Sequence, residues 1–233
     1  MNARQKILYL LVKHGKISHK EAKLALQSGR VLLNENVCFE NVLVGYYDSL
    51  YLDQQCLLNG NRFLYYKFYK PIGIECTLQS EISHSLFNYL GPKYTDLFYV
   101  GRLDKQSEGL LILSNDGHIY NKVISPKHQI EKRYWVQLEK KIKADFKEKM
   151  ENGVAILGTL TLPCTVEILD DFSFEIILTQ GLNRQIRRMC FALGNYVTQL
   201  KRLSIGQISL ENMNSGEIQV LDQTEINWLR NLT

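Results

Sequence analysis

An aspartate between two cations is the first group in the sequence that could do chemistry. Asp104 lies in the segment Gly101-Arg102-Leu103-Asp104-Lys105, just before the apolar run Leu110–Leu113. Neighbouring cations favour the ionised form of a carboxylate, and a carboxylate must be ionised to act as a nucleophile. The alternative is a structural role, because an Asp in a turn commonly caps that turn. The segment supplies a candidate nucleophile and leaves both roles open.

Three arginines in the C-terminal part of the chain form a candidate anion site. On a helix predicted over residues 183–193, Arg184, Arg187 and Arg188 fall within an arc of about 100°, with the apolar residues on the opposite side. Three guanidinium groups so close repel one another unless an anion or a carboxylate lies among them. Phosphate is the obvious anion, and an exposed basic helix face without a partner is the alternative.

Basic residues gather in two segments. The net charge is only +4, but residues 1–30 hold seven Lys and Arg, Lys20 and Arg30 among them, against one acid. Residues 31–58 hold four acids and no Lys or Arg, whereas residues 181–202 hold five Lys and Arg and no acid. Two separated basic segments predict a polyanionic partner, most often nucleic acid.

Composition and missing motifs exclude several classes of protein. The 233 residues, 45% hydrophobic and 22% charged, are typical of a globular chain with one large domain or one domain and a small module. The early apolar run Ile7–Val12 is far shorter than the roughly 20 residues of a membrane span, and no signal-peptide cleavage site follows it. The five cysteines lack CxxC spacing and the five histidines lack metal-ligand spacing, so we expect no disulfide framework, no metal and a cytoplasmic location. HExxH, GxSxG, P-loop and GxGxxG motifs are also absent, and we therefore expect chemistry without a cofactor.

The elements that must position these residues indicate an α+β protein in two parts. Residues 1–58 suggest two short helices and a small β element, with a capping box at Ser18-His19-Lys20-Glu21 and a turn at Asn34-Glu35-Asn36. The polar stretch 53–61 is the expected linker. Beyond it strand-like runs dominate, which predicts a mixed, mainly antiparallel sheet. The expected strands are 63–69, 110–113, 134–138, 174–179 and 196–203, and further helices are expected near 143–151 and 222–231.

Four segments in a fixed order make this part of the chain recognisable. Val100–Asp104, continuing through Ser107–Leu111 to Asn115–Gly117, resembles the signature of the RsuA/RluF-type pseudouridine synthases. Three further motifs of that family are resembled by Lys70-Pro71-Ile72-Gly73, Glu131-Lys132-Arg133-Tyr134 and Gly181–Met189. The form of the last motif, with Gly153–Thr159 upstream, is most similar to the branch of the ribosomal large-subunit synthase F. Residues 4–45 resemble an S4 RNA-binding domain.

The resemblance implies an S4-like α/β RNA-binding module over residues 1–58 and a catalytic domain over residues 59–233. The family isomerises uridine in RNA: the C1′–N1 bond breaks, the uracil turns, and C5 bonds to C1′ without any cofactor. By resemblance, Asp104 attacks the nucleotide, Arg187 pairs with Asp104, and Tyr134 packs on the base and takes part in the proton step at C5. Arg102 would enter the duplex where the flipped base has left. The residues expected to bind RNA are Arg102, Lys105, Arg184, Arg188, Lys70, Lys20 and Arg30.

The S4-like segment departs from its family more than the catalytic motifs do. It has Ser18-His19-Lys20 where two arginines commonly follow the serine, and Leu32–Glu35 where a Val-Asn-Gly hairpin is usual. We expect a monomer that acts on a uridine of 23S rRNA, with tRNA as a second candidate substrate and no membrane or small-molecule partner. One alternative is a non-catalytic RNA-binding or ribosome assembly factor, which would use the same basic segments. An RNA hydrolase would need a second carboxylate or a metal near Asp104, and Glu108 is the only acid close in sequence.

Overall fold

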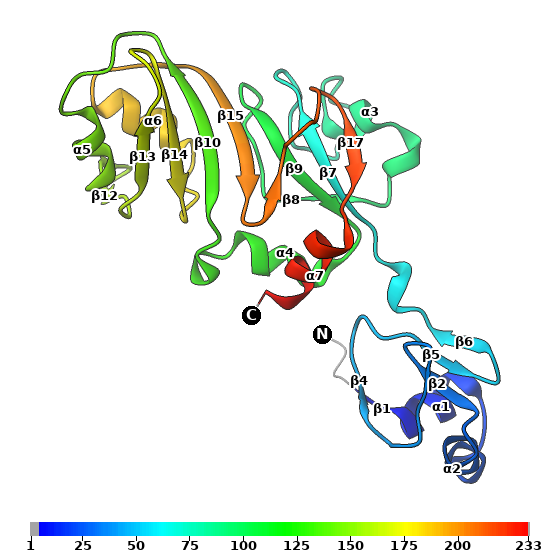
Figure 1. Ribbon diagram of the computed structural model, residues 1–233. Coiled ribbons are helices and arrows are strands. Elements are labelled where there is room, and N and C mark those ends of the chain that lie inside the picture. The colour runs from blue at the N-terminus through cyan, green and yellow to red at the C-terminus, as the bar shows by residue number, and fades with distance from the viewer. Residues whose placement is uncertain (1–4, 233) are drawn as a thin grey trace. The chain divides into compact units, whose positions relative to one another are not determined.

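The computed structural model describes residues 5–232 and divides the chain into two compact units, residues 1–63 and 64–233 (Figure 1). The sequence predicts the division at residue 58, just before a 3-10 helix over Gly60–Arg62 that ends the first unit. Among the described residues, no helix has the length and apolar character needed to cross a bilayer.

Two short helices and two small antiparallel sheets build the first unit. Its core contains Ile7, Leu11, Ala25 and Leu50, all fully buried. The predicted capping box is present at the start of α2: the Ser18 hydroxyl accepts the Glu21 N–H, and the Glu21 carboxylate accepts the Ser18 N–H. The helices are α1 (Ile7–Gly15) and α2 (His19–Gln27), and the sheets are β1 (Gln5–Lys6) with β4 (Leu43–Val44), and β3 (Asn36–Val37), β2 (Val31–Leu33), β5 (Leu50–Leu52) and β6 (Gln55–Leu58) in that order.

The predicted linker over residues 53–61 is wrong. Its first half is a β-hairpin, in which Asp53 and Gln54 form the turn between β5 and β6 with φ of 49° and 68°. Asn34 and Glu35 make a similar turn, with φ of 50° and 67°, where the sequence predicts one. Polar residues favour turns and linkers alike, so composition did not separate the two.

A nine-stranded mixed sheet forms the second unit. Neighbouring strands are antiparallel except β9 and β15, which pair in parallel through Lys201 with Glu108 and Arg202 with Gly109. The mixed sheet of mainly antiparallel strands that the sequence predicts is confirmed. The order along the sheet is β13 (Thr165–Ile168), β14 (Ser173–Leu178), β10 (Lys132–Leu138), β15 (Val197–Ile205), β9 (Glu108–Ser114), β7 (Tyr65–Lys70) and β17 (Ile218–Val220), with β16 (Ile208–Ser209) beside β15 and β8 (Phe98–Val100) beside β9.

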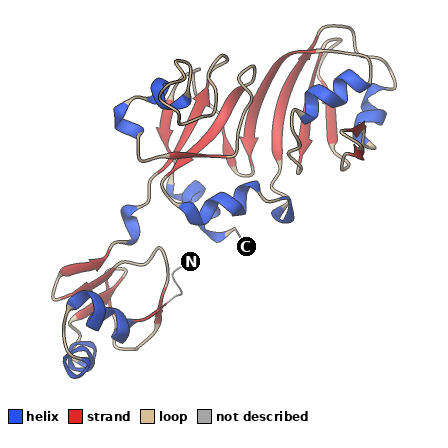
Figure 2. Ribbon diagram, turned by 180° about the vertical axis from the view of Figure 1, so that it is seen from behind, coloured by secondary structure: helices blue, strands red, loops and turns tan. Residues whose placement is uncertain are grey.

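Helices cover this sheet in separate groups (Figure 2). α5 (Phe146–Glu151) and α6 (Gln185–Ala192) pack at the β13 end, where the small hairpin of β11 (Ala155–Ile156) and β12 (Thr159–Leu160) also lies. α4 (Gly117–Ile124) and α7 (Gln223–Asn231) lie side by side, joined by a hydrogen bond from the Lys122 amine to the Arg230 carbonyl. α3 (Leu86–Leu90) lies near β7, and two 3-10 turns occupy Pro92–Tyr94 and Pro126–His128.

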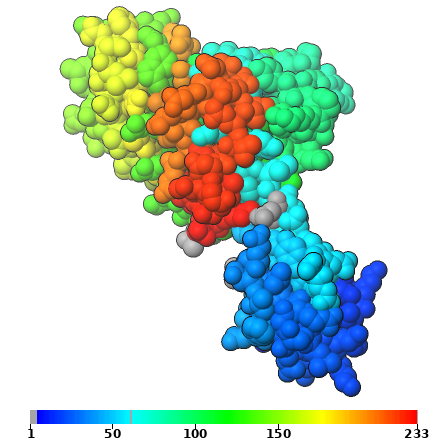
Figure 3. All heavy atoms as spheres, turned by 45° about the vertical axis from the view of Figure 1, so that its right-hand side comes forward, coloured from blue at the N-terminus to red at the C-terminus, as the bar shows by residue number. Residues whose placement is uncertain are grey.

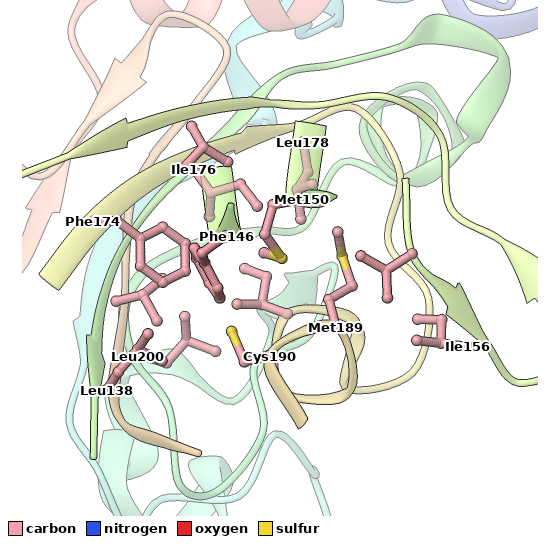
Figure 4. Close-up of a cluster of buried hydrophobic side chains, with 14 residues drawn as sticks. Leu138, Phe146, Met150, Ile156, Phe174, Ile176, Leu178, Met189, Cys190 and Leu200 are labelled. Carbon is pink, nitrogen blue, oxygen red and sulfur yellow. The ribbon is translucent and has the colours of Figure 1, made fainter. Parts of the chain in front are cut away.

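Two hydrophobic clusters lie in the two halves of the sheet. The first fills the space between α5, α6 and strands β10 and β14, and includes Phe146, Phe174 and Met189 (Figure 4). The second includes Phe68, Leu103 and Leu111 and packs around β7 and β9. Tyr134 is half-buried and packs against both clusters.

The C-terminal segment forms the edge of the sheet beside β7. β17 pairs with β7, placing Ile218 opposite Phe68, and Figure 3 shows β17 and α7 at the surface beside that strand. The N-terminus of α7 is fixed by a capping box between Asp222 and Glu225, and Glu225 also accepts a 2.9 Å hydrogen bond from the Lys67 amine.

Candidate active site

Asp104 lies in a short loop between β8 and β9 that is fixed at several points. The Asp104 carbonyl accepts the Ser107 N–H at 3.0 Å, and Ser107 is buried. Leu103, also buried, anchors the loop in the second hydrophobic cluster. The carbonyl of Lys105 accepts the Gly73 N–H at 2.8 Å, which ties the loop to the Lys70-Pro71-Ile72-Gly73 turn. These contacts hold the Asp104 carboxylate, one third exposed, in the lining of a cavity.

Tyr134 enters the same cavity from a different part of the chain. It lies on β10, where alternation along the strand places Lys132 and Tyr134 on one face of the sheet. The Lys132 amine donates a 2.9 Å hydrogen bond to the Ile130 carbonyl. Burial, and to a lesser extent the nearby Arg202 charge, lowers the pKa of Lys132 to about 8.

Arg202 is a buried cation in this cavity that the sequence analysis did not assign to the site. It is 3% exposed, its Nε donates to the Leu110 carbonyl at 2.7 Å, and its Nη1 donates to the Arg102 carbonyl at 3.4 Å. Within the described part of the chain, its Nη2 is buried without a hydrogen-bond partner. The sequence shows a basic residue on a predicted strand, but it does not show which groups Arg202 contacts, because those groups lie on β9 and in the Asp104 loop.

The cavity has a volume of about 190 Å³ and brings the Asp104 loop together with β10, β15 and the segment before α6. Its charged groups are one carboxylate, Asp104, and three cations, Arg102, Lys132 and Arg202. Tyr134, Leu182 and Leu200 add apolar surface. A small cavity with a carboxylate, an aromatic ring and several cations can hold a flat, polar molecule next to an anion and attack it with Asp104.

The arginines near α6 are arranged differently from the prediction. α6 begins at Gln185, and Arg184 is its N-cap residue with φ of 51°, so the three arginines do not share a helix face. Arg184 makes the ion pair with Asp104, with 3.6 Å between Nη1 and Oδ2, whereas the expected partner was Arg187. The Arg187 guanidinium instead donates to three oxygens, the carbonyls of Gln106 and Val197 and the Ser107 hydroxyl. Arg187 therefore braces the loop that carries Asp104, and it lies outside the cavity.

The basic residues expected to bind RNA fall into two groups. Arg102, Lys105 and Arg188 are exposed, and Arg102 lines the cavity. Lys70 is fully buried, and its amine donates to the carbonyls of Pro71 and Ile74 at 2.8 Å. Burial lowers the pKa of Lys70 to about 8. The expectation that Lys70 contacts RNA is therefore corrected: its amine stabilises the turn beneath the Asp104 loop.

In the first unit, Lys20 is exposed on α2 and Arg30 lies at the start of the sheet. The Arg30 guanidinium makes a two-bond contact with the Asp53 carboxylate in the β5–β6 turn. That hydrogen bonding lowers the pKa of Asp53. Arg30 thus stabilises the hairpin, and its exposed side chain stays accessible to solvent.

Comparison with known proteins assigns the chain to a family. The profile of the family described as RNA pseudouridylate synthase matches residues 65–192. The ribosomal small subunit pseudouridine synthase A of Vibrio vulnificus (strain CMCP6) is 35% identical over 217 residues, which are 90% of this chain and 92% of that protein. The dual-specificity RNA pseudouridine synthase RluF of Escherichia coli (strain K12) is 40% identical over 157 residues, and the match spans 54% of that protein.

A solved structure supports the same assignment over the whole chain. The crystal structure of a pseudouridylate synthase is 28% identical in sequence and similar in fold, with a TM-score of 0.67. The similarity covers 97% of this chain and 99% of the solved one. The chain therefore belongs to the RNA pseudouridylate synthase family and is an isomerase.

Proposed function

We propose that the chain converts a uridine of ribosomal RNA to pseudouridine, with Asp104 as the nucleophile. The supporting observation is that Asp104, from the loop between β8 and β9, and Tyr134, from β10, line one cavity of about 190 Å³. Pockets for drug-sized ligands are usually larger, about 300–1,000 Å³. A small cavity favours a single flipped base over a larger molecule, and flipping is needed because a stacked base cannot reach Asp104.

In this proposal the Asp104 carboxylate attacks the nucleotide while the C1′–N1 bond breaks. The freed uracil turns and forms the C5–C1′ bond, and the bond between Asp104 and the nucleotide breaks. C5 loses its proton and N1 gains one, so that the product is an isomer of the substrate. Tyr134 packs on the base, and its hydroxyl takes part in the proton step. Arg184 pairs with Asp104, and Arg187 holds the Asp104 loop in place. The latter is a positioning role rather than the direct pairing that the resemblance implies.

The basic residues outside the cavity would hold RNA phosphates without reading the sequence. Arg102 lies at the cavity and would fill the space that the flipped base leaves in the duplex. Residues 1–58, with Lys20 and Arg30, would add affinity as an S4-like module. We further propose that the protein acts as a monomer in the cytoplasm.

Three candidate RNA substrates are supported by two observations. The form of the Gly181–Met189 motif favours 23S rRNA, with tRNA as a second candidate. The similarity to a synthase named for the ribosomal small subunit, over 90% of this chain, supports small-subunit rRNA as the third candidate. Mapping pseudouridines in both rRNAs and in tRNA, from cells with and without the gene, identifies the substrate.

Asp104→Asn tests the mechanism. The amide has nearly the same shape as the carboxylate but is a far weaker nucleophile, so RNA binding should survive while isomerisation is lost. The substitution also removes a negative charge that faces RNA, and binding could even tighten. Purified Asp104→Asn protein that still forms pseudouridine, above any contaminating wild type, would refute the assignment of the nucleophile.

A further inference from the structure

A second cavity lies beside the Asp104 loop, and the proposed chemistry does not use it. Its volume is about 380 Å³. Gln106 lines it, two residues after Asp104, and Arg187 joins the two regions through its bonds to Gln106 and Val197. The remaining lining residues are Arg184, Arg188, Phe191 and Tyr196.

Two aromatic rings at this cavity face solvent. Phe191 is 61% exposed and Tyr196 is 52% exposed, and their ring centroids are 5.5 Å apart. The Lys140 amine lies 5.8 Å from the centre of the Tyr196 ring. A single exposed phenylalanine is ordinary, but two neighbouring rings beside several cations form a surface that suits a flat, electron-rich group carrying negative charge.

The backbone around the rings is firmly held. Asn195, 5% exposed, donates to the Lys140 carbonyl at 2.8 Å and accepts the Lys140 N–H at 3.0 Å. The Glu139 N–H donates to the Tyr196 carbonyl at 2.9 Å. These bonds fix the Lys140 and Tyr196 backbones side by side. The backbone that carries the Tyr196 ring is therefore held in place, which lowers the entropy cost of binding a ligand beside that ring.

The charges at this cavity favour a nucleic acid as its occupant. Arg184, Arg187 and Arg188 line it, and among the residues that the structure describes none of those lining it is acidic. Proteins that bind single-stranded nucleic acid combine cations along the backbone with aromatic rings on which bases stack. Both components are present here within one cavity.

We propose that this second cavity binds one unstacked nucleotide of the RNA substrate. The base stacks on one of the two rings, Phe191 or Tyr196, and contacts the other at an angle, because the ring planes are inclined by 60°. The phosphate lies against Arg188 and Arg184. Because the cavity adjoins the Asp104 loop, its occupant is a nucleotide close in the RNA chain to the target uridine. The inference rests on the proposed function for its substrate, and it adds a base-binding subsite outside the active-site cavity.

Binding of a short single-stranded RNA that contains the fluorescent base 2-aminopurine tests this subsite. Phe191→Ala and Tyr196→Ala should each weaken binding roughly fivefold or more and reduce the quenching of the fluorescent base, because a stacked base is lost. Their dependence of log K on log salt should match that of the wild type. Phe191→Trp keeps a ring and should restore binding.

Two further variants separate stacking from charge and from general surface effects. Arg188→Ala should flatten the salt dependence by about 0.7, because one phosphate contact is lost. Phe172→Ala removes another exposed ring, in the turn before β14 and outside this cavity, and should change nothing. The inference is wrong if the Phe191 and Tyr196 variants bind and quench the RNA as the wild type does.

Pseudouridine formation on rRNA transcripts keeps this inference distinct from the proposed function. If the wild type forms no pseudouridine in any transcript, the proposed function fails, while the titration still decides whether the rings stack on RNA. If the aromatic variants bind free RNA normally but modify ribosomal particles poorly, the surface contacts protein and the subsite is refuted.

Discussion

Replacing Gly109 by alanine would put a methyl group between the two strands that meet at the active site. A Cβ atom at this position would lie 2.3 Å from the Arg202 carbonyl oxygen and 2.5 Å from the Arg202 nitrogen. These are backbone atoms of β15, so no side-chain rotation can relieve the overlap. Gly109 also has φ of 111°, a backbone conformation that side-chain-bearing residues rarely adopt.

Both effects cost stability. A residue held in a sparsely populated backbone region costs about 1–3 kcal/mol, and an extra carbon forced into a packed interior costs a further ~1–3 kcal/mol. The free energy of unfolding should therefore fall by roughly 2–6 kcal/mol, a large fraction of the ~5–15 kcal/mol typical of a folded domain. Any strand separation that relieved the strain would also displace Arg202 from the cavity, so the activity of the folded fraction should fall too.

Urea unfolding followed by tryptophan fluorescence reports on the part of the chain that contains Gly109, because both tryptophans, Trp135 and Trp228, also lie in residues 64–233. Gly117→Ala is the matched control, since a Cβ there would meet no atom within 4 Å and φ is not positive. The control should unfold at the same urea concentration as the wild type or at a slightly higher one. A Gly109→Ala protein within about 1 kcal/mol of the wild type would refute the steric argument.

Four further perturbations separate the roles assigned above. Tyr134→Phe should bind RNA normally but slow single-turnover isomerisation by roughly 10²–10⁴-fold, and an unchanged rate would reduce Tyr134 to a packing surface. Removing residues 1–63 should weaken RNA binding and flatten its salt dependence by about 0.7–0.9 per lost phosphate contact, yet keep the rate at saturating RNA. Arg187→Ala should keep RNA binding but lower the rate at saturating RNA, because the Asp104 loop loses its brace. Equal losses of affinity and of saturated rate in the two variants would contradict this division. Lys70 has a pKa of about 8 in the fold against an ordinary 10.5, so the unfolded chain binds more protons between these values and stability rises with pH across that window. From about pH 7.5 to 9.5 the free energy of unfolding of the wild type, measured in urea, should rise by about 1–2 kcal/mol relative to that of Lys70→Met. If the two free energies stay parallel over this range, burial does not lower the pKa of Lys70.

Local signals in the sequence predicted the elements whose stability is local. The capping box at Ser18 and Glu21 could be found because both of its bonds join residues three apart. The run over residues 134–138 gave β10, whose alternation is set by neighbours along the strand. The turn at Asp53 and Gln54 was misassigned, because its hairpin depends on the pairing of β5 with β6 rather than on its own residues.

The sequence predicted only those site residues that lie in recognisable motifs. Asp104 was a candidate from its neighbouring cations and then by resemblance, Tyr134 was found by resemblance alone, and both line one cavity. Arg184 was assigned to a helix face, but its left-handed conformation places it before the first residue of α6, and its guanidinium pairs with Asp104. Arg202 was missed because its partners, Leu110 and Arg102, are 92 and 100 residues away in sequence.

The one parallel pair in the sheet, β9 with β15, has a consequence for the order of folding. Each half of the sheet has its own hydrophobic cluster and is built from strands that are antiparallel to their neighbours. Joining the halves closes a long loop of chain, and such long-range contacts are slow to form. Asp104 comes from one half, and Tyr134 and Arg202 come from the other. The active site is thus assembled where β9 pairs with β15, and a local opening of this pair would abolish catalysis while leaving both hydrophobic clusters intact.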